Sequence, residues 1–158
     1  MTGAVDPLDA AVLALFAKEP RVGVLEASRR LGVARGTVQA RLDRLASRGI
    51  VRGWGPDVDP TALGYRVAAF ITLEISQRGH RAIESALANI PEVLEAHTIT
   101  GSGDMLVRVV ARTNADLQRV VDDVLVINGV DRSNMVIALA TGVPFRTQPL
   151  VEQAARGS

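Results

Sequence analysis

The sequence contains no cysteine, which excludes disulfide bonds and every metal site that depends on thiolate ligands. It has only two histidines, His80 and His97, which are too few to form a zinc site by themselves. Aromatic residues account for 3% of the chain, so the apolar cores must consist mainly of Ala, Val, Leu and Ile. Nothing in this composition predicts a metal ion or any other cofactor.

Long hydrophobic runs are also missing. No stretch reaches the roughly 18 consecutive apolar residues that a membrane-spanning helix needs, and the N-terminal sequence lacks the basic segment that opens a signal peptide. We therefore expect a cytoplasmic protein without a membrane partner. Hydrophobic residues still make up 47% of the 158 residues, which is enough for one mid-sized domain or two small ones.

Charge is distributed unevenly along the chain. Residues 1–54 have nine basic and five acidic side chains, whereas residues 55–158 have nine basic and twelve acidic ones. Residues 29–52 contain seven arginines and a single acid, Asp43. A basic N-terminal part indicates a nucleic-acid partner, although a solvated charged helix face gives the same composition.

Three short helices are predicted in the N-terminal part. Asp6, Pro7 and Asp9 are typical of a helix start, and apolar residues at helical spacing continue this first helix. A second helix is predicted over residues 24–31, with Gly32 in the turn that follows it. Two helices around a glycine-containing turn are the pattern of a helix-turn-helix motif.

The third predicted helix, residues 35–48, is the clearest because Val38, Leu42 and Leu45 form one buried stripe. Residues 50–59 contain the sequence Gly-Trp-Gly-Pro and are predicted to form a short hairpin, or wing. Helices, turn, basic face and wing in this order favour binding to double-stranded DNA, because such a helix fits the major groove.

The candidate DNA-binding residues lie in and just after this third helix. Residues near its N-terminus would meet base edges, and arginines further along suit the flanking phosphates. The alternative is a three-helix bundle whose arginines only increase solubility. The first group is Arg35, Thr37 and Gln39, and the second is Arg41, Arg44, Arg48 and Arg52.

After residue 66 the apolar pattern changes from a helical period to a period of two. Strands are predicted over residues 67–75, 93–100, 105–111 and 133–140, with helices over 79–90 and from a cap at Asn114. This β-α-β-β-α-β order is the ferredoxin-like pattern. After Thr141 the chain turns polar, and we expect a tail that frays.

A glycine-containing loop joins the two middle strands of this pattern. Its glycine N–H groups suit a ligand carboxylate, its aspartate suits an amino group, and two threonines add hydroxyl groups nearby. The alternative is an ordinary tight turn that the aspartate holds together. The candidate ligand-binding residues are Thr98, Thr100, Gly101, Gly103, Asp104 and Met105.

Six segments carry a resemblance to a known family. They are Pro7-Leu8-Asp9, Leu31-Gly32-Val33, residues 38–45, Gly49-Ile50-Val51, residues 99–106 and Asn128-Gly129-Val130. Together they make residues 7–141 resemble the Lrp/AsnC family, also called feast/famine regulators. The family often has a capping Ser where this chain has Ala34.

The resemblance implies a DNA-binding domain joined to a ferredoxin-like domain that responds to a ligand, commonly an amino acid. It implies a ligand position between dimers, near the loop from Gly101 to Asp104. It also implies homodimers formed through the C-terminal sheets and often assembled into octamers.

We therefore predict an α+β protein that acts as a sequence-specific DNA-binding transcription regulator, controlled by a small ligand, and not as an enzyme. One alternative is a ligand-independent architectural DNA-binding protein. Another is a haem-pathway decarboxylase on the same scaffold, which would need His80 or His97 to act on a tetrapyrrole. The predicted parts are a winged helix-turn-helix domain (1–53), a wing and linker (54–65), a ferredoxin-like sensing and dimerisation domain (66–141) and a C-terminal tail (142–158).

Overall fold

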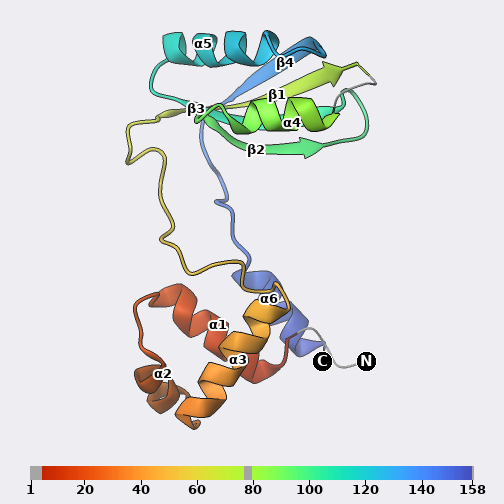
Figure 1. Cartoon of the computed structure of the whole chain (residues 1–158). Helices are drawn as coiled ribbons and strands as arrows, with labels where there is room; N and C mark the ends of the chain where they lie inside the picture. The colour runs from red at the N-terminus through yellow and green to blue at the C-terminus, as the bar shows by residue number, and fades with distance from the viewer. Residues whose placement is uncertain (1–4, 77–79, 158) are drawn as a thin grey trace. The chain divides into compact units, whose positions relative to one another are not determined.

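The computed structural model describes residues 5–76 and 80–157. The chain divides into two compact units, Met1–Asp57 together with Val143–Ser158, and Val58–Gly142 (Figure 1). The chain therefore passes between the units twice. No helix of the two described ranges is long and apolar enough to cross a membrane.

The first unit is built from helices. It contains α1 (Pro7–Lys18), α2 (Val24–Leu31), α3 (Arg35–Ser47) and α6 (Gln148–Arg156). The first three confirm the predicted helices almost to the residue. Their shared core consists of side chains that bury one apolar stripe from each helix: Val12, Ala27, Val38 and Leu42.

The turn between α2 and α3 depends on a glycine. Gly32 has a φ of 66°, in the left-handed region where a side chain is strained. Its N–H caps α2 by donating to carbonyl groups of that helix. The tight turn places α3 directly after α2, as a helix-turn-helix requires.

The predicted hairpin over residues 50–59 is absent, and this prediction is corrected. These residues form no strand and pair with none of the described strands. Pro56 lacks an N–H donor for a ladder, and the N–H groups of Ile50 and Val51 donate instead to Leu45 at the end of α3. Trp54 packs edge-on against Phe16 of α1, with ring centroids 5.8 Å apart.

The C-terminal tail is also corrected, because it does not fray. Residues 148–156 form α6, which packs against α1 in the first unit (Figure 1). Ala155 is buried there, and Val151 is half-buried. The sequence pattern did not predict it because Gly142, Pro144 and Pro149 made this segment resemble a polar tail.

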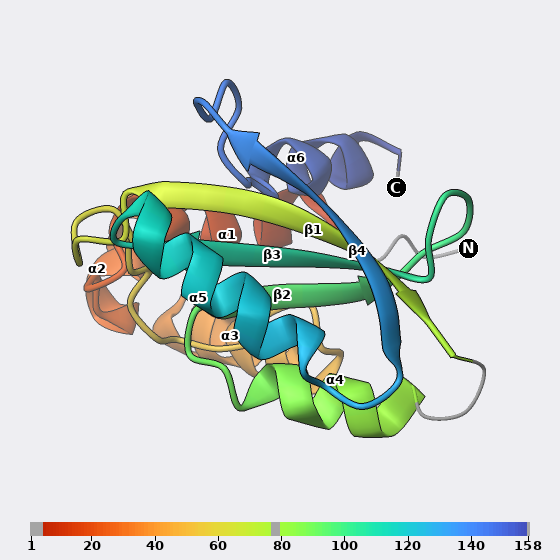
Figure 2. The same ribbon diagram turned by 90° about the horizontal axis from the view of Figure 1, so that it is seen from above.

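The second unit is a four-stranded antiparallel sheet with two helices. Its strands are β1 (Val67–Ile75), β2 (Val93–Thr98), β3 (Met105–Ala111) and β4 (Val130–Ala138), in the spatial order β2-β3-β1-β4. Its helices are α4 (His80–Ala88) and α5 (Asn114–Leu125). The element order confirms the predicted β-α-β-β-α-β pattern. Figure 2 shows α5 crossing the sheet, with α4 beside it.

Alternation along the strands decides which face of the sheet is covered. Ala69, Ile71 and Leu73 of β1 are fully buried in one core with Ile83 of α4 and Val120 of α5. Both helices therefore cover the same face. Among the described residues of this unit, no helix packs on the opposite face.

Several predicted boundaries in this unit differ from the structure. The strands predicted to end at residues 100 and 140 end at Thr98 and Ala138. The helix predicted over 79–90 ends at Ala88, and its predicted first residue, Gly79, lies outside the described residues. Thr113, not Asn114, caps α5, because its side chain accepts the N–H of Asp116. The last strand begins at Val130, three residues before its predicted start, because Val130 pairs with the end of β1.

Candidate functional site

The α3 helix presents the basic surface predicted from the sequence. Val38, Leu42 and Leu45 are buried and hold one side of α3 in the first unit. Arg35 and Gln39 lie exposed near its N-terminal end. A helix whose apolar stripe is buried and whose polar side is open can enter a groove of DNA.

The exposed polar side chains of α3 are not equally free. Gln39 donates to the Asp43 carboxylate one turn away, over 2.8 Å, and Thr37 is half-buried. Arg35, Arg48 and Arg52 are exposed, and none forms an ion pair with another described residue. These three guanidinium groups are available to phosphates.

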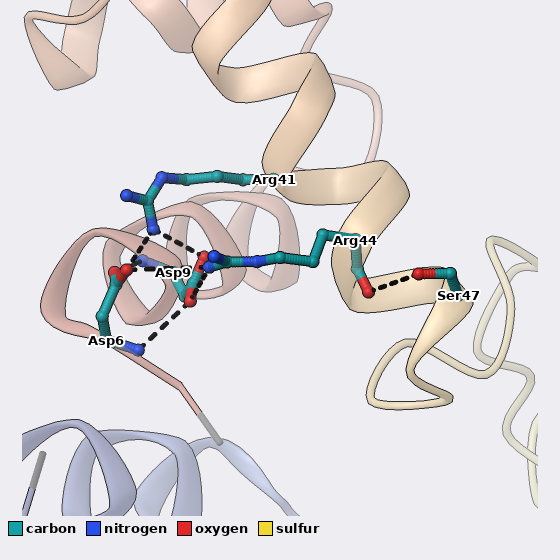
Figure 3. Close-up of polar contacts among 5 residues, drawn as sticks. All are labelled: Asp6, Asp9, Arg41, Arg44 and Ser47. Atoms are coloured by element: carbon teal, nitrogen blue, oxygen red, sulfur yellow. Dashed lines mark hydrogen bonds and ion pairs between the residues drawn. The ribbon is translucent and has the colours of Figure 1, made fainter. Parts of the chain in front are cut away.

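Arg41 and Arg44 are instead paired with acids of α1 (Figure 3). Arg41 donates to both Asp6 and Asp9, with a distance of 2.8 Å between its Nη1 and Asp9 Oδ1. Arg44 donates to Asp9 Oδ2 through Nη2. We call these four residues, Asp6, Asp9, Arg41 and Arg44, the α1–α3 ion cluster.

Asp6 and Asp9 also form the capping box of α1. Asp6 Oδ1 accepts the N–H of Asp9, and Asp9 Oδ2 accepts the N–H of Asp6, over 2.8 and 3.1 Å. The hydrogen bond from Arg41 is the main reason that the pKa of Asp6 falls to about 2. The same bond raises the pKa of Arg41. Both groups of this pair therefore stay charged at neutral pH.

The ion cluster could not be predicted from a single sequence. Its carboxylates lie 32 to 35 residues from the arginines they bind. Asp9 fits the start of α1 by its own local pattern, and Arg41 and Arg44 fit a basic helix face by theirs. Only the packing of α1 on α3 brings these two patterns together.

The glycine loop of the second unit is a tight and well-bonded turn. The Asp104 carboxylate accepts the N–H of Ile75 over 2.8 Å, at the irregularity where the pairing of β1 with β4 shifts register. The Asp104 N–H donates to the carbonyl of Leu73, also over 2.8 Å. Asp104 therefore has a clear structural role at the end of β1.

Gly103 is required at its position by packing. A Cβ atom there would lie 2.3 Å from Cγ2 of Thr72 and 3.2 Å from the backbone oxygen of Leu73, so a larger residue would force the loop or β1 to shift. Met105 is 1% exposed and belongs to the core beneath the helices. Its side chain is thus part of the core and does not line the loop.

The remaining loop residues are open to solvent. Thr98, Thr100 and Gly101 are exposed, and Gly101 has a φ of 112°. The structure therefore separates the six candidate ligand residues into two groups. Three lie on the surface of the loop, and three do not: Gly103 and Asp104 fix its shape, and Met105 belongs to the core.

The two histidines lie in exposed positions. His80 begins α4, and His97 lies on β2, where its Nε2 is 3.5 Å from Glu95 Oε2. The other oxygen of Glu95 is 3.5 Å from Arg108 of β3. Both histidines are therefore solvated surface groups, and their described surroundings add no support to the decarboxylase alternative.

Two family descriptions match this chain. Residues 5–52 match a winged helix-turn-helix DNA-binding domain, and residues 68–147 match the Lrp/AsnC ligand binding domain. The HTH-type transcriptional regulator FL11 of Pyrococcus furiosus is 30% identical over 139 residues, which cover 88% of this chain and 92% of that protein. An uncharacterised HTH-type transcriptional regulator of the same organism is also 30% identical and covers 92% of this chain and 99% of its own length.

Solved structures share the fold over nearly the whole chain. The AsnC protein of E. coli has a TM-score of 0.84 at 26% identity, covering 92% of this chain and 99% of that one. A transcriptional regulator from Neisseria meningitidis, solved as a complex with L-Met, has a TM-score of 0.81 at 22% identity, covering 93% and 99%. The matched relatives are transcriptional regulators, not enzymes.

Proposed function

Because this chain belongs to the Lrp/AsnC family of DNA-binding transcription regulators, we propose that it recognises specific DNA sites through α3. We also propose that a small ligand, an amino acid, changes its activity or its assembly. The regulator acts as a homodimer that assembles further into an octamer.

The observation that supports the DNA part is the arrangement of unpaired arginines around α3. Arg35 stands at its first residue, Arg48 at its C-cap and Arg52 just beyond it, all exposed. Positive charge at both ends of one helix suits the two phosphate backbones that border a major groove. Gln39 and Thr37 lie between them, where base edges would be read.

Gln39 is the residue that we assign to sequence discrimination. Its amide can exchange the hydrogen bond to Asp43 for a bidentate pair with an adenine edge. Arg41 and Arg44 are not part of this contact set, because both are paired with acids of α1.

The proposed ligand site is the surface of the glycine loop. Thr98, Thr100 and Gly101 offer two hydroxyl groups and an exposed backbone to a ligand carboxylate. A regulator of the same fold was solved with L-Met, which makes amino acids the first ligand class to test. An architectural protein without a ligand is the second candidate, because Asp104 and Met105 have structural roles that need no ligand.

The experiment compares Gln39→Ala and Arg35→Ala with the unchanged protein on its own upstream DNA and on unrelated DNA. Gln39→Ala should reduce the discrimination between the two by roughly 1–3 kcal/mol, because one base contact is lost. Arg35→Ala should weaken binding to both DNAs and lower the salt slope by about one. Fluorescence anisotropy at several salt concentrations measures both quantities.

The same titrations, repeated with a panel of amino acids, test the ligand. An affinity or stoichiometry that changes with one amino acid supports regulation by that ligand. No response to any of them favours the architectural protein, and unchanged binding in both variants would refute the assignment of α3.

A further inference from the structure

We propose that Asp6 and Asp9 are positioning residues for DNA binding, which hold Arg41 and Arg44 on α1 and keep them away from the phosphate backbone. The inference rests on the proposed docking of α3. It predicts that two of the most prominent basic residues of this helix contribute no phosphate contact in the native protein.

The position of the two arginines on α3 makes this restraint meaningful. Thr37, Arg41, Arg44 and Arg48 are spaced by four, three and four residues, so they share one stripe of the helix. Arg48 of this stripe is free, whereas Arg41 and Arg44 bend towards α1 (Figure 3). Without acids on α1, all three guanidinium groups would be open to the same DNA strand.

The burial of Asp9 explains why the restraint is firm. The Asp9 side chain is 1% exposed, and both of its oxygens accept guanidinium N–H groups. If these partners were lost, the buried Asp9 side chain would keep only the N–H of Asp6 as a hydrogen-bond donor and no opposite charge beside it. DNA phosphates therefore cannot draw Arg41 and Arg44 away without leaving this buried charge unpaired.

Asp6 adds a second anchor for Arg41. Its Oδ2 accepts a hydrogen bond from the Arg41 Nη1 that also binds Asp9. The pKa of Asp6, lowered by Arg41 to about 2, keeps this anchor charged throughout the physiological range. The two acids at the start of α1 therefore fix the charge pattern that α3 shows to DNA.

A functional consequence follows from this geometry. Phosphate contacts raise affinity for every sequence alike. Two arginines withheld from the backbone lower non-specific affinity and leave base contacts unchanged. The ion cluster therefore increases the share of binding energy that depends on sequence.

The decisive comparison is Arg44→Gln against Arg48→Gln, two changes one turn apart on the same stripe. Each phosphate contact contributes about 0.9 to the slope of log affinity against log salt. Arg48→Gln should lower the slope by about one. Between 50 and 200 mM salt this variant should therefore lose about threefold less affinity than the unchanged protein does. Arg44→Gln should leave the slope unchanged, because its partner is Asp9 and not DNA.

The outcomes separate the two proposals. If Arg44→Gln lowers the slope as much as Arg48→Gln does, Arg44 already contacts phosphate and the positioning role is overturned. If neither variant changes the slope, the proposed docking of α3 itself fails.

A third variant, Asp9→Asn, tests the restraint from the other side. It removes the charge with almost no change in shape, and the amide oxygen can still accept the N–H of Asp6 in the capping box. Released arginines should raise the slope by up to about two and strengthen binding to unrelated DNA at low salt. The double variant Asp9→Asn with Arg44→Gln should have a slope about one lower than Asp9→Asn alone. If Asp9 had only a structural role, the slope would stay at the native value in the single and in the double variant. If Asp9→Asn does not fold, the comparison of Arg44 with Arg48 still decides.

Discussion

At the scale of single residues, the Asp104 carboxylate has two possible roles, binding a ligand or holding the turn. From its sequence it suits a ligand amino group, yet in the structure it accepts the N–H of Ile75, a residue that is 8% exposed. Asp104→Ala would leave this N–H without a partner. We expect a loss of about 1–3 kcal/mol in the free energy of unfolding, the usual cost of an unsatisfied buried donor.

Chemical denaturation of the Asp104→Ala variant measures this loss, and Thr100→Ala is its control. Thr100 is exposed in the same loop and should leave stability almost unchanged. A ligand response that survives in Asp104→Ala places the residue in the turn alone. A stable variant that has lost its response would show instead that Asp104 binds the ligand.

Residues whose role is local were predictable, and residues whose role depends on packing were not. Asp6 and Pro7 predict the start of α1 correctly, because helix capping depends only on residues within one turn. The partners of Arg41 and Arg44 depend on how α1 crosses α3, which no local pattern encodes. Such residues are assigned correctly only when tertiary structure is known.

At the scale of elements, strong apolar periodicity predicted α1, α2, α3 and the whole second unit. The elements that were wrong lie in segments that Gly and Pro interrupt. The hairpin predicted over residues 50–59 does not form because Gly53, Gly55 and Pro56 supply little pairing capacity. The helix α6 was missed because Pro and Gly residues around it resemble those of a polar tail. A helix of nine residues folds through contact with α1 and not through its own propensity.

The packing of α6 leads to a prediction about stability. Ala155→Asp introduces a charge into the buried contact with α1 and should destabilise the first unit by roughly 1–3 kcal/mol. Gln153→Asp adds the same charge at an exposed position of α6 and should have little effect. Trp54, the only tryptophan, contacts Phe16 of α1, so its fluorescence reports the unfolding of this unit. Equal stability of the two variants would show that α6 does not support the unit.

At the scale of the whole molecule, the sheet has one covered and one open face. Phe70 of β1 pairs with Val136 of β4, and both point away from the core beneath α4 and α5. Val136 is 60% exposed, and Leu106 of β3 lies on the same face by alternation. Apolar side chains gathered on one face usually mark an interface. This face is therefore our candidate for the homodimer contact.

The dimer prediction is tested by placing a charge on this open face of the full-length chain. Val136→Glu should turn a dimer or larger assembly into monomers at micromolar concentration, because an interface would have to bury the new carboxylate without a partner. Val126→Glu is the matched control, since Val126 is 80% exposed but follows α5, away from the open face. Sedimentation velocity measures both masses. A monomer before any substitution, or an assembly that Val136→Glu leaves intact, would exclude this face as the contact. If only Val136→Glu loses the dimer, the apolar side chains on the open face have an explanation. Two copies together would bury the apolar surface that a single chain leaves exposed, including Val136 and Phe70.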